Sequence, residues 1–242
     1  AVDFVEARKH PQSADLDATI RSAPAWRAFP TIDPMRDLEW MIQQGNELLV
    51  RHAVSDAQVD AAIASIAKPE SLGVPGVVAW RGVVNGADVV FLRAQPHVIR
   101  ITPASTARAV ASDLVARPPR APTFAPSEAA RILVPHPARR ISDVPDDVTE
   151  ARISVESHPA DSSADLWMEA DCPNASSART DAARIAELIQ QKNNFAVRLV
   201  TAGLLNSAEV HPAGRHVDAH VKATSQQIQS VLALVRAQSG GP

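Results

Sequence analysis

The hydrophobic and polar positions of this chain alternate in two series, one on each side of a segment with little periodicity. Residues 38–117 and 148–237 each predict two strands, a helix, two further strands and a closing helix. Residues 118–147 between them are rich in proline and predict a linker. We therefore expect an α+β protein with two small sheet-plus-helix units of ββαββα order, ferredoxin-like or related, joined by this Pro-rich linker. Residues 1–37 would form an N-terminal arm and residues 238–242 a tail.

Turn and capping residues mark the element boundaries of the first unit. Gly45-Asn46 and Asn85-Gly86 each separate two apolar runs, which predicts two hairpins. Ser55 and Gln58 predict a capping box at the start of a helix. Thr102-Pro103 predicts an N-cap followed by proline at the first position of the closing helix.

The second unit shows the same signals with different residues. A helix is expected from Ser176 to a break at Asn193-Asn194, after which Val197, Leu199 and Val200 resume an apolar run. A hairpin is expected about Pro212-Ala213-Gly214, and Thr224 with Gln227 predicts a second capping box. Sequence identity between the two halves is negligible, so internal duplication and convergence both stay open.

Composition and charge limit the classes of partner. The 242 residues are 45% hydrophobic and 21% charged, which is typical of a globular protein. A net charge of −3 gives no general attraction to nucleic acid, and we expect none as a partner. No apolar run approaches the roughly 18 residues of a membrane-spanning helix. The chain begins at Ala1 without methionine, so we expect a removed upstream segment, which leaves room for a lipid anchor before Ala1.

Motifs of catalysis and cofactor binding are missing from the sequence. There is no Gly-x-Ser-x-Gly elbow and no glycine-rich phosphate loop, so we expect no catalytic residues and no cofactor. The single cysteine, Cys172, excludes an intrachain disulfide and precedes Pro173, where we expect a structural thiol. These absences favour a protein that is not an enzyme.

The sharpest group of candidate ligands is a set of histidines near the last hairpin. His211 and His216 flank its turn, and we expect them to face each other across the strands with Cβ atoms about 5 Å apart. Asp218 shares a strand face with His216, so His211, His216 and Asp218 are a candidate zinc or copper site. His220 is about 13 Å from His216 along the strand, too far to share an ion. The alternative is a solvated polar face of the hairpin.

Several stretches together resemble a group of uncharacterised myxobacterial proteins of exported or lipoprotein-like type. The resemblance covers about residues 30–237 and implies a place in the periplasm or cell envelope, with no catalytic residues to carry over. The residues that carry it are 32–40, 50–52, 60–63, 73–77, 90–97 and 198–205.

Two functional hypotheses follow from the sequence. The first is a non-catalytic structural or protein-interaction protein of the bacterial cell envelope, with a protein partner or a homo-oligomer. The alternative is a hydrolase or small-ligand-binding protein whose pocket lies between the two domains. Cytoplasmic location stays open beside the envelope.

Overall fold

The computed structural model describes the chain except for residues 24–25, 27–28, 30, 140, 142, 195–196, 199–200 and 240–242. The chain divides into two compact units. Unit 1 comprises residues 1–8, 16–124 and 239–242, and unit 2 comprises residues 9–15 and 125–238.

Both units combine runs of antiparallel strands with helices, as expected of an α+β protein. The strands of unit 1 are β1 (Val2–Asp3), β2 (Leu38–Gln44), β3 (Glu47–His52), β4 (Ala67–Glu70), β5 (Val78–Val84), β6 (Ala87–Gln95) and β7 (Val98–Pro103). Those of unit 2 are β8 (Glu128–Pro135), β9 (Glu150–His158), β10 (Ser163–Asp171), β11 (Glu209–Ala213) and β12 (His216–Ala223). The helices are α1 (Phe4–Ala7), α2 (Ser13–Ser22), α4 (Pro34–Asp37), α5 (Asp56–Ala64), α6 (Ala107–Ala116), α7 (Ala175–Lys192) and α9 (Ser225–Ser239), with 3-10 turns η1 (Pro137–Arg139) and η2 (Leu204–Ser207).

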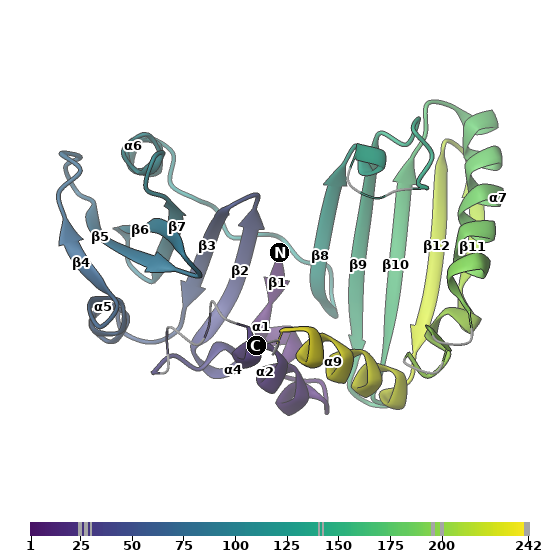
Figure 1. Cartoon of the computed structure of the whole chain (residues 1–242), viewed down its shortest axis with the longest axis horizontal. Coiled ribbons are helices and arrows are strands. Elements are labelled where there is room, and N and C mark those ends of the chain that lie inside the picture. Colours follow the sequence, from purple (N-terminus) through teal and green to yellow (C-terminus); the bar gives the residue numbers. More distant parts are fainter. Residues whose placement is uncertain are drawn as a thin grey trace. The chain divides into compact units, whose positions relative to one another are not determined.

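The strand order corrects the fold that the sequence predicted. The seven strands of unit 1 and the five strands of unit 2 follow antiparallel orders that a ferredoxin-like unit does not have, so the expectation of two ferredoxin-like ββαββα units joined by a linker was wrong. Within unit 1 the order is β1-β2-β3-β7-β6-β5-β4, and within unit 2 it is β11-β12-β10-β9-β8 (Figure 1). In unit 1, α5 follows the β2–β3 hairpin and leads to the edge strand β4, and the chain returns through β5 and β6 to β7, which pairs with β3. In unit 2, α7 follows the β9–β10 hairpin and leads to the edge strand β11, and β12 then pairs with β10.

Two strands that the pattern missed explain much of the error. β4 contains Pro69, a residue type that usually marks the end of a helix, whereas an edge strand tolerates proline because one side of its backbone needs no partner. β8 lies inside the segment expected to be a linker and pairs with β9 from Glu128 to Pro135. The prolines of residues 118–147 made the whole segment resemble a linker. They flank β8 on both sides, and only Pro135, its last residue, lies within the strand.

The turns predicted at Gly45-Asn46 and Asn85-Gly86 and two of the predicted caps are confirmed, whereas Pro212 and Ala213 lie in β11 and the last hairpin turns at residues 214–215. Asn85 and Gly86 both have positive φ, +52° and +76°, in the turn between β5 and β6. Ser55 and Gln58 form a reciprocal capping box at α5. At α9 the backbone amide of Thr224 donates to Oε1 of Gln227 at 2.8 Å, which completes the second box.

The predicted start of the closing helix of unit 1 was wrong. β7 continues through Pro103, which pairs with Val89, and the amide of Ala104 donates to the carbonyl of Asp88 at 3.0 Å. α6 therefore begins at Ala107, with Thr106 at the N-cap. In unit 2, α7 ends at Lys192 as the Asn193-Asn194 break predicted, while Leu199 and Val200 lie outside the described residues.

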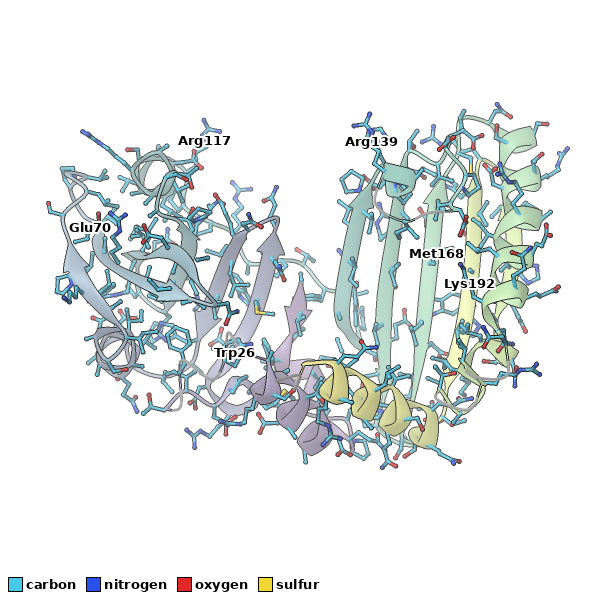
Figure 2. The ribbon with its side chains drawn as sticks, viewed as in Figure 1. Trp26, Glu70, Arg117, Arg139, Met168 and Lys192 are labelled. Carbon is cyan, nitrogen blue, oxygen red and sulfur yellow. The ribbon has the colours of Figure 1, made fainter. Side chains whose placement is uncertain are left out.

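A helix covers one face of the strands in each unit. In unit 1, Val90 and Leu92 of β6 pack against Ala111 and Leu114 of α6. In unit 2, α7 packs on β11 and β12, and its core side chains meet those of β10 and β12 (Figure 1). Met168 of β10, labelled in Figure 2, packs against that core. Because side chains alternate along a strand, each helix leaves the opposite face of its strands for other contacts.

Candidate functional site

Unit 1 has a cavity of about 600 Å³ on the side of its strands opposite α6. Val89 and Phe91 of β6 line it, while Val90 and Leu92 between and beyond them face α6. The same alternation places apolar side chains of the neighbouring strands in its wall. These are Leu38 and Met41 of β2, Leu48 and Val50 of β3, and Ile99, Ile101 and Pro103 of β7.

Aromatic side chains from the segment before α4 complete one wall of this cavity. Phe29 meets Phe91 edge-to-face, with ring centroids 5.7 Å apart. Trp26, labelled in Figure 2, meets Phe29 in the same way at 6.5 Å. Such pairs hold rings at fixed angles, so the wall has a defined shape.

Polar side chains gather where the β2–β3 and β5–β6 turns border the cavity. Two carboxylates lie there, and each has an arginine partner. Glu47 accepts a hydrogen bond from Arg100, and Asp88 forms an ion pair with Arg81 at 2.5 Å. The hydrogen bond from Arg81 lowers the pKa of Asp88. The amides of Gln43, Asn46 and Asn85 also line this end.

His52 lines the cavity and is 2% exposed. Its Nδ1 lies 2.9 Å from the carbonyl oxygen of Val54, and its Nε2 has no hydrogen-bond partner among the described residues. Burial lowers the pKa of His52, so its ring is neutral at neutral pH.

Asp56 and His97 lie next to His52. Nε2 of His52 is 3.5 Å from Oδ1 of Asp56, and the two imidazole ring centroids are 5.4 Å apart. None of these three residues was predicted as a ligand from the sequence. They come from β3, α5 and the β6–β7 turn, and only the pairing of β3 with β7 brings them together.

The predicted position of His211 opposite His216 at the last hairpin was wrong, while the metal site of His211, His216 and Asp218 stays a prediction. His211 pairs with Asp218, and His216 pairs with Ala213, so His211 and His216 are not opposite each other. The turn is shorter than we expected, because β12 already begins at His216. His211 instead lies 3.8 Å from Glu209, and Nδ1 of His216 lies 2.5 Å from Asp171 and 3.9 Å from Glu169.

A second cluster that the sequence reasoning missed lies on the face of β9, β10 and β12 that α7 does not cover. Asp165 accepts hydrogen bonds from Nε2 of His158 at 2.7 Å and from Nε2 of His220 at 2.8 Å. Trp167 stacks on His220 with ring centroids 4.0 Å apart. Burial tends to raise the pKa of Asp165, but the hydrogen bonds from the two histidines outweigh it and lower that pKa.

Cys172 is buried, and the buried carboxyl group of Asp181 lies near it. Its Sγ lies 3.8 Å from the carbonyl of Ala170, and burial together with Asp181 raises its thiol pKa to about 12. A thiol held in the protonated form is a poor nucleophile. The geometry therefore offers no cysteine chemistry at this position.

Comparisons with known proteins add no family. No family model and no curated protein matches the sequence. Among solved structures, a chain described as a double-ringed trimeric shell protein from the RMM microcompartment is 14% identical, with coverage of 86% of this chain and 93% of that one. Its TM-score of 0.17 is too low to carry an argument about fold or function.

The sequence predicted no membrane-spanning helix, and the described helices bear on this point. None of them combines the length and the apolar character needed to cross a bilayer.

Proposed function

We propose that this protein binds a small, uncharged and largely apolar molecule in the cavity of unit 1. The observation that carries the proposal is the cavity of about 600 Å³ with apolar side chains from β2, β3, β6 and β7 along its length. From the sequence we expected, as the alternative function, a ligand pocket between two domains. The ligand proposed here would instead bind within unit 1.

The size and lining of the cavity define the class of ligand. Ligand pockets span about 300–1,000 Å³ and are mostly apolar with a few placed polar groups. A volume of 600 Å³ suits a molecule on the order of 20 non-hydrogen atoms. Contact with the apolar part of the ligand would remove hydrocarbon surface of Leu48 and Ile101, which are partly exposed, from water, and this favours binding.

The polar end of the cavity favours a ligand without charge. Glu47 and Asp88 are already paired with Arg100 and Arg81, so no unbalanced charge is offered to an ion. A free carboxylate on the ligand would meet two further carboxylates. The neighbouring amides can instead pair with a hydroxyl or carbonyl group at the outer end of the ligand.

Titration with N-phenyl-1-naphthylamine, a neutral apolar dye that fluoresces when removed from water, tests the proposal. We expect saturable binding by the wild-type chain. In Leu48→Trp the larger ring fills part of the cavity, and we expect the dye to bind at least about tenfold more weakly. Val83→Trp is the matched control, because Val83 is 64% exposed and does not line the cavity.

Three results would count against the proposal. These are no saturable dye binding, equal loss in both tryptophan variants, or unchanged binding in a folded Leu48→Trp protein. Circular dichroism of each variant shows whether it is folded.

The interaction hypothesis stays a prediction beside this proposal. It includes a protein partner or homo-oligomer, a cell-envelope location and a lipid anchor before Ala1. Light scattering after size exclusion tests the oligomer, because a single 25.8 kDa species at all concentrations would contradict it.

A further inference from the structure

We propose that His52, Asp56 and His97 bind one divalent transition-metal ion, with Zn²⁺ the best match. This site adjoins the cavity at His52, which lines it, while Asp56 and His97 lie outside the lining.

The three side chains are close enough to share an ion. One ligand atom from each lies within 4.8 Å of the others. Nε2 of His52 and Oδ1 of Asp56 are 3.5 Å apart. Two atoms that bind the same tetrahedral zinc at 2.0–2.1 Å are about 3.4 Å apart, so this pair already has the required separation.

The Val54 carbonyl fixes the tautomer of both rings. Nδ1 of His52 lies 2.9 Å from this oxygen, and Nδ1 of His97 lies 3.1 Å from it. A carbonyl oxygen only accepts hydrogen bonds, so each Nδ1 carries the proton and each Nε2 carries the lone pair. A backbone carbonyl that holds the far nitrogen of an imidazole is the usual support of a metal-binding histidine.

Local backbone structure holds the group in place. Asp56 is the first residue of α5, directly after the capping residue Ser55. Its Oδ1 accepts the backbone amide of His97 at 2.8 Å, and the amide of His52 donates to the carbonyl of His97 at 3.0 Å. His97 has a φ of +63°, which is uncommon for a residue with a side chain. The site is therefore built before any ion binds.

The charges around the site favour a cation. Arg93 contacts Oδ2 of Asp56 at 3.2 Å and Asp60 at 2.6 Å. One guanidinium between two carboxylates leaves one negative charge, and both histidines bind metal as neutral rings. The lone pair on the buried Nε2 of His52 has no other partner among the described residues, and an ion would supply one.

The other group of potential ligands in the described chain is a weaker candidate. Glu169, Asp171 and His216 on β10 and β12 also lie within 4.8 Å of one another. That group has one imidazole instead of two, and Glu169 is exposed. Exposed carboxylates are solvated and lose water when they bind an ion, whereas His52 is already buried.

Calorimetric titration of the full chain with ZnCl₂ after treatment with a chelator tests the proposal. We expect one Zn²⁺ per chain in the wild type. His97→Asn removes an imidazole but keeps a residue that tolerates positive φ, and we expect it to weaken binding by at least about tenfold. His136→Asn is the matched control, because His136 is an exposed histidine with a φ of +47°. His52→Gln is a second test, which circular dichroism must first show to be folded.

Co²⁺ provides an optical readout of the same site. Two imidazoles and a carboxylate around Co²⁺ should give visible absorption that His136→Asn keeps and His97→Asn loses. Absence of zinc binding by the wild type, or equal affinity of His97→Asn and His136→Asn, would overturn the proposal. Loss of binding in His216→Asn alone would assign the ion to Glu169, Asp171 and His216 and would overturn it too.

Discussion

Among single residues, the buried and partly buried carboxylates of this chain differ in the direction of their pKa shifts: the pKa of Asp181 is raised, whereas that of Asp165 is lowered. Asp181 of α7 is 2% exposed, and its Oδ2 has no hydrogen-bond partner among the described residues. Burial raises its pKa; Cys172 opposes this shift and Asp147 adds to it. Such a group is more stable in its neutral form when folded, so ionisation of Asp181 opposes folding.

Asp181→Asn should therefore stabilise the protein at a pH above the raised pKa. The stability that neutral Asp181 allows is complete below the pKa of the unfolded chain and is lost as pH rises through the folded pKa. Asparagine has the same size and stays neutral, so we expect a gain of about 1 kcal/mol at mildly alkaline pH and no difference in acid.

Urea unfolding of Asp181→Asn at both pH values measures this effect. Asp113→Asn on α6 is the control, because Asp113 is an exposed helical carboxylate. A variant that is less stable than wild type at alkaline pH would contradict the prediction.

At the scale of elements, register decides which polar side chains meet. Trp167 pairs with His220 across β10 and β12, and Asp165 two residues away reaches His158 and His220. The register of β11 with β12 separates His211 from His216 in the same way. A shift of one residue would move every side chain to the other face, so these contacts follow from the pairing and not from spacing along the chain.

Asp165→Asn should destabilise unit 2 at neutral pH. The pKa of Asp165 is lowered in the folded chain, so its stabilisation is present above the unfolded pKa and is lost as pH falls through the folded pKa. We expect a loss of about 1 kcal/mol near pH 7 that becomes smaller at about pH 3, below the pKa of an unfolded aspartate. Asp218→Asn on β12 is the control in urea unfolding at both pH values. Equal loss at both pH values would assign the effect to packing instead of charge.

For the molecule as a whole, the net charge determines whether it attracts nucleic acid in general. The chain has 24 Lys and Arg against 27 Asp and Glu, a net charge of −3. Many of the arginines are already paired with carboxylates, among them Arg81, Arg93 and Arg100. The negative net charge gives no general attraction to a phosphate backbone.

We therefore expect no binding to duplex DNA at physiological salt. Fluorescence anisotropy of a labelled 20-base-pair duplex should stay constant up to about 10 µM protein at about 0.15 M salt. A saturable rise that persists at this salt concentration would show a local basic surface and contradict the prediction.

Much of the local structure could be predicted from the sequence. The Asn85-Gly86 hairpin and the capping boxes at Ser55 and Thr224 are set by neighbouring residues, because only those residue types meet the backbone requirements of each position. The α+β class follows from the same periodicities. Pro69 and Pro103 misled the prediction, since a strand edge and a strand end accept proline as readily as a helix start does.

Residues a few positions apart set the Gly45-Asn46 and Asn85-Gly86 turns, the starts of α5, α7 and α9 and the apolar stripes of these helices, so these features could be predicted locally. The strand order, the cavity face of β6 and the meeting of His52 with Asp56 and His97 come from long-range packing. Those features depend on pairing between β3 and β7, which are about 50 residues apart in the chain. Contacts across such a separation are selected by the packing of whole elements, and local patterns do not encode them.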